Sequence, residues 1–248
     1  MFKRVNQNTN NKDLLDLLGW LLKLELRIQY LKMRQKWLLF FSLVSIIVCS
    51  LYSCTKNLTY NRVIYSNDFN DSTNGNLELI GWENGITKQL TGNRISLFNN
   101  NIVLGKLNNN IVLLDFKNLE YHQMVRVEFD LYIHNNWNNS LFVFKTDDQY
   151  QLITSFSNDS TVMQSYPNWF GNGSPQFAAG NQAQEIYMPG VCNLINSQRG
   201  SSWYKIVRTI PHQSNSLEVN ISDAGGEVND TCNRSWSIDN LKISLLHN

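Results

Sequence analysis

The sequence predicts an all-β sandwich in the part of the chain that follows an apolar N-terminal segment. After residue 60 the chain consists of short runs rich in β-branched and aromatic residues, separated by clusters of Asn, Gly, Ser and Asp. About ten such runs occur, and several alternate apolar with polar residues, which is the period of a half-buried strand. No stretch of useful length after Cys54 has helical spacing, so we expect two packed sheets.

The alternation is clearest in residues 124–133. One face of this expected strand carries Val125, Val127, Phe129, Leu131 and Ile133, and the other carries Arg126, Glu128, Asp130 and Tyr132. The last strand is expected in WSIDNLKISLL, which contains the polar pair Asp239 and Asn240. Residues 162–199 lack a strand pattern and hold most of the prolines, so we expect a long irregular loop there, of the kind that often carries function.

Composition excludes some classes of function. The chain has 248 residues, 42% of them hydrophobic, which is enough for the core of one large domain or two small ones. The net charge is +1 and only 17% of the residues are charged, so the clustered basic face of a nucleic-acid-binding protein is not expected. Asn often occurs in runs, which we interpret as loops because Asn tolerates turns and left-handed backbone.

Residues 33–54 have the pattern of a secretory signal or anchor helix. Arg34 and Lys36 precede an uncharged, mostly apolar run of roughly 16 residues, slightly short of the ~20 that span a bilayer. The run ends in LYSC, which resembles the lipobox of bacterial lipoproteins, a family in which the cysteine is acylated and becomes the mature N-terminus. This resemblance implies a lipid on Cys54 that anchors an exported protein to a membrane. An uncleaved signal anchor is the alternative.

Residues 1–32 precede this signal. Leucines recur there at helical spacing and Asp13 can cap the helix, as in an amphipathic helix that lies on a membrane. Because a signal normally begins a protein and Met33 begins a complete one, we expect residues 1–32 to lie outside the natural product. The expected parts are therefore the upstream segment 1–32, the lipoprotein-type signal 33–54 and a β-sandwich domain at 55–248.

Two of the four cysteines, Cys192 and Cys232, fall in the exported domain. An oxidising compartment allows them to pair, and closing a loop of about 40 residues would stabilise the fold by roughly 4 kcal/mol if chain entropy dominates. The disulfide would join the loop at 162–199 to the turn before the last strand. Two free buried thiols are the alternative.

From Tyr60 to Leu246 the chain resembles exported jelly-roll sandwiches of the concanavalin-like and carbohydrate-binding-module type. The similar pieces occur in the family's order: SNDFND followed by GW, VRVEFDLYIHNNWN, TSFSN with MQSYP, TIPHQSNSLEVNIS and SWSIDNLKI. The resemblance implies a jelly roll whose first and last strands lie near each other. This chain has Ser237 where relatives often have Gly, and Asn233-Arg234 where they have acidic residues.

The same resemblance implies a structural calcium ion. In similar carbohydrate-binding modules, an Asp of the last strand and carboxylates near the first strand hold Ca²⁺. Here these residues are Asp68, Asp71 and Asp239, whose hard oxygen ligands suit that ion. The alternative is that Asp239 and Asn240 cap a bend with local hydrogen bonds, and the sequence leaves both open.

The sequence contains no recognisable catalytic constellation. In EFDLYI, Glu128 and Asp130 match the E-x-D-x-x-E strand of retaining glucanases, but Ile133 replaces the second acid that such chemistry needs. No G-x-S-x-G motif is present, and the four histidines show no zinc-binding spacing. We therefore expect a protein that binds and is not an enzyme.

Tryptophans in loop-like contexts are the candidate ligand-binding residues. Trp137 lies in HNNWNN, and Trp169 lies in YPNWFGNG with Tyr166 and Phe170 nearby. An indole beside amide side chains can receive a sugar ring, with the C–H face on the indole and the hydroxyls on the amides. The alternative is that each Trp folds inward. The tryptophans in strand-like contexts are expected in the core: Trp82, Trp203 and Trp236.

These observations favour an exported lipoprotein in the cell envelope or at the cell surface, with one binding or adhesion module. The favoured partner, besides the membrane that holds the lipid, is a polysaccharide or surface glycan, and no nucleic acid is expected. A structural envelope protein that contacts other proteins through a sheet face is the second reading of the sequence. A divergent glycoside hydrolase is the third.

Overall fold

A computed structural model of the chain describes most of the residues from 60 onward. The described residues are 60–71, 77–83, 86–90, 94–171, 173, 176–197, 199–224 and 230–247, with six helical residues upstream, Gly19, Lys23, Glu25, Arg27, Gln29 and Met33. The chain divides into two compact units, Met1–Asn57 and Leu58–Asn248. Cys54 and the apolar run before it lie outside the described residues. Within the described part, no helix has the length and apolar character needed to cross a membrane.

The described part of Leu58–Asn248 is built almost entirely of strands. They are β1 (Tyr60–Asn67), β2 (Glu78–Glu83), β3 (Ile86–Gln89), β4 (Ile95–Phe98), β5 (Asn101–Leu107), β6 (Asn110–Phe116), β7 (Met124–Asn135), β8 (Asn138–Thr146), β9 (Gln149–Ser157), β10 (Glu185–Met188), β11 (Ser201–Pro211), β12 (Leu217–Ala224) and β13 (Arg234–His247), with a 3-10 helix η1 (Cys192–Leu194).

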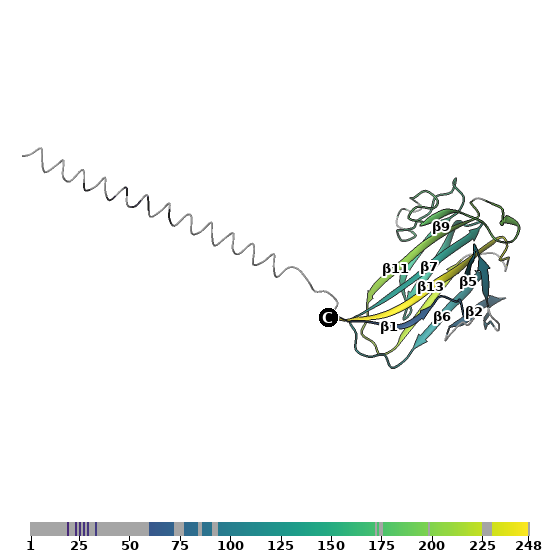
Figure 1. Cartoon of the computed structure of the whole chain (residues 1–248), viewed down its shortest axis with the longest axis horizontal. Coiled ribbons are helices and arrows are strands. Elements are labelled where there is room, and N and C mark those ends of the chain that lie inside the picture. The colour runs from purple at the N-terminus through teal and green to yellow at the C-terminus, as the bar shows by residue number, and fades with distance from the viewer. Residues whose placement is uncertain are drawn as a thin grey trace, which may run out of the picture. The chain divides into compact units, whose positions relative to one another are not determined.

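The strands form two antiparallel sheets (Figure 1). The first has the order β10-β11-β7-β13-β5-β4, with β1 also paired to β13, and the second has the order β3-β2-β6-β12-β8-β9. The two-sheet all-β prediction is confirmed. The first and last strands lie side by side, as the resemblance implied, with Tyr60 opposite His247. The finer jelly-roll order remains a prediction.

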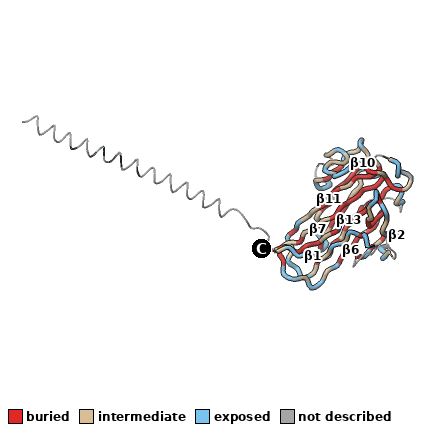
Figure 2. The backbone as a smooth tube through the Cα atoms, in the orientation of Figure 1, coloured by how far each residue is buried: buried red, intermediate tan, exposed pale blue. Residues whose placement is uncertain are grey.

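The main core lies between the sheets, because each sheet turns one apolar face inward. The five alternating apolar residues of β7 are all buried there, as expected, and so is Trp236 of β13. Buried backbone runs along the central strands of the first sheet (Figure 2).

The outer face of the first sheet is also covered near the end of β7. Its polar-face residues Asp130, Tyr132 and His134 are buried, unlike Arg126 and Glu128, which are half-buried. A second apolar cluster forms on this face, with members from four different parts of the chain: Phe98, Val103, Tyr132, Met188 and Val191, packed against Trp203 and Cys192. This cluster positions the candidate site.

Asparagine performs the backbone role expected from its runs. Left-handed backbone, with positive φ, occurs at Asn99, Asn100, Asn109, Asn118, Asn135, Asn139 and Asn240. The segment 162–199, expected to be irregular, contains β10 and η1. β10 was missed because only four residues, Glu185–Met188, form an edge strand against β11.

Candidate ligand-binding site

Two of the four predicted ligand-binding residues are core residues. Trp137 is completely buried, and its indole Nε1–H donates to the carbonyl of Ser235 at 2.7 Å. The Arg234 guanidinium lies over its ring at 5.4 Å. Tyr166 is buried with its ring centroid 4.9 Å from that of Phe156. Neither ring offers a face to a ligand, so the prediction for Trp137 and Tyr166 is wrong and the inward-folding alternative applies.

Trp169 and Phe170 lie at the surface, with exposed fractions of 42% and 40%. The backbone N–H of Phe170 donates to the carbonyl of Ile153 at 2.8 Å, which holds this loop against β9. The loop is therefore accessible, but the structure separates it from Trp137 and Tyr166 instead of forming one four-residue site.

A cavity of about 260 Å³ lies at the outer face of the first sheet, and we call it the aromatic cavity. Its lining comes from β4, β5, β7, β10 and β11 and from residues next to β4 and β10: Phe98, Asn99, Asn101, Tyr132, Gln184, Glu185, Met188 and Trp203. Segments far apart in the sequence therefore meet here because β11, β7 and β13 pair in register.

Aromatic rings from neighbouring strands line this cavity. Trp203 lies directly opposite Tyr132, with the two ring planes inclined by 21° and their centroids 6.2 Å apart. Phe98 meets Tyr132 edge-on at 5.5 Å. Trp203 was expected in the core; it is half-buried and packs against the second apolar cluster instead of the main core. Its neighbour Tyr204 points to the core instead, because successive side chains of a strand face opposite ways.

Polar side chains complete the lining. Asn99 lies in the tight turn between β4 and β5, and Asn101 begins β5. Gln184 directly precedes β10, and Glu185 begins it. One carboxylate oxygen of Glu185 accepts the backbone N–H groups of Ile186 and Tyr187 at 3.0 and 2.8 Å, which fixes this side chain. The cavity thus combines the partly exposed ring of Trp203, backed by the buried rings of Tyr132 and Phe98, with amide and carboxylate groups.

Two titratable groups on the outer face of β7, Tyr132 and His134, are uncharged at neutral pH. Burial, and then the nearby charge of Asp130, raise the pKa of Tyr132 to about 12, so its hydroxyl stays protonated. Burial, and then the charge of Lys106, lower the pKa of His134 to about 3. The neutral imidazole of His134 lies 2.8 Å from the hydroxyls of Ser201 and Ser237, one at each ring nitrogen. This buried group ties three strands together.

Two buried carboxylates lie beside the cavity. Asp130 and Asp239 are directly opposite each other on β7 and β13. The Asn240 amide bridges them, donating to Asp130 Oδ2 at 2.8 Å and to Asp239 Oδ2 at 3.3 Å. Asn101, which lines the cavity, also donates to Asp239 Oδ2. Burial raises the pKa of Asp239, and the charges of Asp130 and Asp68 raise it further.

The expected calcium ligands do not assemble into a site. Asp68 and Asp71 are exposed, and a backbone N–H donated by Asn70 lowers the pKa of Asp68. Among the described residues, no group of three or more Asp, Glu, His or Cys side chains is placed to hold a metal. The groups directed at Asp239 are N–H donors, which occupy the oxygen lone pairs that Ca²⁺ would need. These residues do not fit the ion.

The polar pair of the last strand instead matches the alternative of local hydrogen bonds. β13 pairs with β5 at Trp236–Ile238 and with β1 from Leu241 onward. Asp239 and Asn240 stand where the partner changes, and the register with β7 shifts at the same point. Asn240 has φ of 51° and donates its backbone N–H to Asp239 at 2.7 Å. The pair shapes this bulge.

Replacing Asp130 with asparagine should stabilise the fold at pH 7 by removing one of two adjacent buried charges. Oδ1 of Asp130 is buried and meets no donor in the described part of the chain. Because folding raises the pKa of Asp239, wild-type stability is lost as pH rises from 3.8 through that raised value. Thermal unfolding should show a midpoint gain that is larger at pH 7 than at pH 4, with about 2–4 °C per kcal/mol for a domain of this size.

The same experiment tests calcium. The thermal midpoint of wild-type protein should be the same in Ca²⁺ as in chelator. If Ca²⁺ raises the wild-type midpoint and Asp130→Asn abolishes the increase, the carboxylate pair holds the ion and the hydrogen-bonded interpretation fails.

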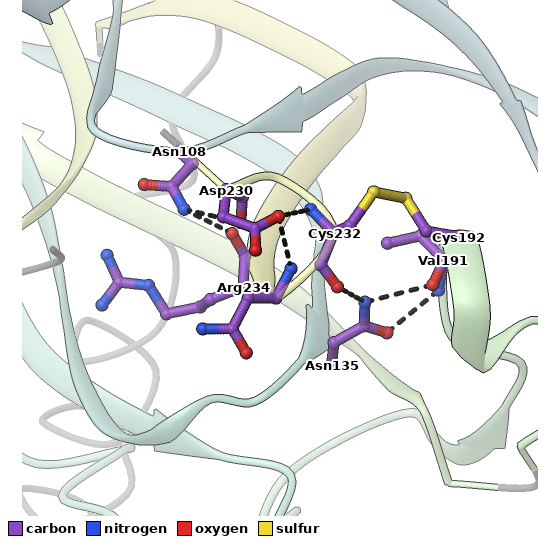
Figure 3. Close-up of a disulfide and its surroundings, with 8 residues drawn as sticks. Asn108, Asn135, Val191, Cys192, Asp230, Cys232 and Arg234 are labelled. Atoms are coloured by element: carbon purple, nitrogen blue, oxygen red, sulfur yellow. Dashed lines mark hydrogen bonds between the residues drawn. A yellow bond between two sulfur atoms is a disulfide. The ribbon is translucent and has the colours of Figure 1, made fainter. Parts of the chain in front are cut away.

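The disulfide prediction is confirmed. Cys192 and Cys232 are bonded, with Cα atoms 5.4 Å apart and a sequence separation of 40. Figure 3 shows the Asn135 amide beside the bond, donating to the carbonyls of Val191 and Cys232 and accepting the Val191 N–H. The disulfide joins the segment that follows β10, and hence one wall of the aromatic cavity, to the turn before β13.

The residues of this cavity were missed by the sequence reasoning, although two signals were present. Tyr132 stood on the polar face of its expected strand, where a large aromatic residue needs either a cover or a ligand. The alternation of β11 is a second signal: Tyr204 and Ile206 face the main core, so Trp203, which precedes Tyr204, faces the other side of the sheet.

Compared with protein-family models and with curated proteins, the chain matches none. Among solved structures it is similar to dimeric latent PorU from Porphyromonas gingivalis, with 13% identity and a TM-score of 0.35, covering 75% of this chain and 13% of that one. It is also similar to the K2 cleaved adhesin domain of Lys-gingipain (Kgp), with 12% identity and a TM-score of 0.33, covering 72% of this chain and 96% of that one. Likeness this low assigns no family and no activity, and the site rests on its own geometry.

Proposed function

We propose that this protein binds a glycan at the aromatic cavity and acts as a binding or adhesion module, not as an enzyme. The observation that supports this most strongly is the pairing of Trp203 and Tyr132 with amides and a carboxylate around one cavity. The apolar C–H face of a sugar ring packs on an indole, while its hydroxyls need donors and acceptors at the edge.

The size and chemistry of the cavity suit a short stretch of sugar. Its volume of about 260 Å³ lies just below the ~300–1,000 Å³ of typical small-molecule sites, so it suits one sugar residue of a longer chain. Asn99 and Gln184 can each donate and accept, the Asn101 amide oxygen can accept, and Glu185 has one carboxylate oxygen left to accept hydroxyls.

We place the module outside the cytosol, held to a membrane by a lipid on Cys54. The signal-like segment 33–54 supports export, and the Cys192–Cys232 disulfide is typical of oxidising compartments. Mass measurement of the purified mature protein tests the anchor, since an N-terminus at acylated Cys54 is expected and a retained segment 1–32 would contradict it.

Replacing Trp203 with alanine should weaken glycan binding by roughly 5- to 150-fold, because ring stacking contributes about 1–3 kcal/mol in comparable aromatic contacts. A glycan array with wild-type protein identifies the ligand, and calorimetry compares the variants. Trp169→Ala is the matched control, since Trp169 is exposed and lies outside the lining of the aromatic cavity.

The same two variants distinguish glycan binding at the aromatic cavity from the second candidate function, which is contact with another protein through an exposed loop. A loop that exposes Met163, Trp169 and Phe170 favours a protein-contact surface. Loss of binding in Trp169→Ala with full binding in Trp203→Ala would transfer the site to this loop and reject the aromatic cavity.

A further inference from the structure

A second cavity, of about 270 Å³, lies where β7 and β9 end and β11 begins, and polar side chains dominate its lining. We call it the Asn–Arg cavity. The groups available to a ligand come from Asn136, Asn138, Asp159, Ser197 and Arg199. No part of the proposed glycan contact at Trp203 involves these residues.

Two hydrogen-bonded amides fix the frame of the Asn–Arg cavity, the buried Asn135 and the half-buried Asn158. The Asn135 amide donates to the carbonyls of Val191 and Cys232 and accepts the backbone N–H of Val191. Asn158 donates to the carbonyls of Ile133 and Asn135, at 3.2 and 3.1 Å, and accepts the Ser202 hydroxyl at 2.7 Å. Because these two amides are saturated, the cavity exists without a ligand and loses little entropy on binding.

Arg199 is the unusual member of this cavity. It makes no ion pair with any acid among the described residues, and its Nε–H is buried without an acceptor. Its guanidinium carbon lies 5.8 Å from the ring centroid of Tyr187, which positions the group. A guanidinium without an acidic partner is suited to bind the carboxylate of a ligand, which it can hold through two parallel hydrogen bonds.

Asp159 restricts which anion can enter. Its Oδ1 accepts the backbone N–H and hydroxyl of Thr161 at 2.8 and 2.7 Å, and these bonds lower its pKa and keep it ionised. The cavity therefore holds both signs of charge. A small dianion is repelled, whereas a ligand with a carboxylate at one end and hydroxyls at the other meets a complementary group at each end.

We propose that the Asn–Arg cavity binds a carboxylate-bearing sugar residue, such as a uronic acid. The carboxylate pairs with Arg199, and the ring hydroxyls reach Asp159 Oδ2, the Ser197 hydroxyl and the amide of Asn138. The exposed Asn138 side chain makes no hydrogen bond within the described part of the chain. This number of hydroxyl partners favours a sugar acid over a zwitterionic amino acid.

The test is to titrate the purified protein separately with D-glucuronate, D-glucose, acetate, glycine and inorganic phosphate. Binding is measured from chemical-shift changes in ¹⁵N-resolved NMR spectra. Glucuronate should bind at least tenfold more tightly than each of the other four. Arg199→Gln should weaken glucuronate binding at least tenfold. Arg199→Lys should weaken it less, because lysine keeps the positive charge but lacks the planar pair of donors.

Two controls keep the proposal falsifiable. Arg208→Gln removes a guanidinium that bonds its neighbouring carbonyl of Val207, and should leave glucuronate binding unchanged. Trp203→Ala should also leave it unchanged, which separates this site from the aromatic cavity. Absence of glucuronate binding, phosphate or glycine binding as tight as glucuronate, or full binding in a folded Arg199→Gln variant would each overturn the proposal.

Discussion

Replacing Trp236 with alanine is expected to lower the free energy of unfolding by about 3–5 kcal/mol. The side chain is completely buried in the main core and meets Phe142 edge-on, with centroids 5.7 Å apart. Its Nε1–H donates to Asp223 at 2.8 Å, and the same carboxylate pairs with Arg234 at 2.9 Å. The substitution therefore opens a cavity and also deprives a buried carboxylate of a donor.

Urea unfolding measures the loss in the free energy of unfolding. A second variant separates the packing contribution from the hydrogen-bond contribution, and a third serves as a surface control. Trp236→Phe keeps most of the packing and removes the hydrogen bond, so about 1–3 kcal/mol is expected. Trp169→Ala, at the exposed loop, should stay within about 0.5 kcal/mol of wild type. If Trp236→Ala unfolds no more easily than Trp169→Ala, Trp236 does not belong to the core of this sandwich.

Removing the disulfide, by the double change Cys192→Ser and Cys232→Ser, should cost roughly 4 kcal/mol because the bond closes a long loop in the unfolded chain. Thermal unfolding should then shift down by roughly 10 °C. The folded structure should persist, since the Asn135 amide still ties the carbonyls of Val191 and Cys232.

A thiol reductant supplies the control for this change. It should lower the wild-type midpoint toward that of the double variant, because Cys232 is exposed, and should leave the double variant unaffected. Detection of two free thiols in wild-type protein that was denatured without reductant would contradict the bond.

The sequence predicted what depends on local periodicity. Alternation in β7 separated its core face from its outer face, and Trp236 was correctly placed in the core. The left-handed positions of Asn followed from the tolerance of that residue for turns. The cysteine pair followed from composition and compartment, and needed no knowledge of the fold.

The candidate site could not be predicted from the sequence, because it depends on the register between strands that are far apart in the chain. Trp203 and Tyr132 become neighbours only when β11 pairs with β7, and Phe98 reaches them from a different edge of the same sheet. Asp130 and Asp239 likewise meet only through the register of β7 with β13. Loop context misplaced Trp137, whose indole turns inward to bond Ser235 although Asn residues surround it in sequence.

Contact between the ligand and Trp203 can be measured directly by NMR of the tryptophan side chains. The indole N–H resonances of ¹⁵N-labelled protein are assigned with Trp→Phe variants and followed while the array-identified glycan is added. We expect the Trp203 resonance to shift with ligand concentration while those of Trp137, Trp169 and Trp236 stay in place. A saturable shift at Trp169, with Trp203 unmoved, would contradict glycan binding at the aromatic cavity.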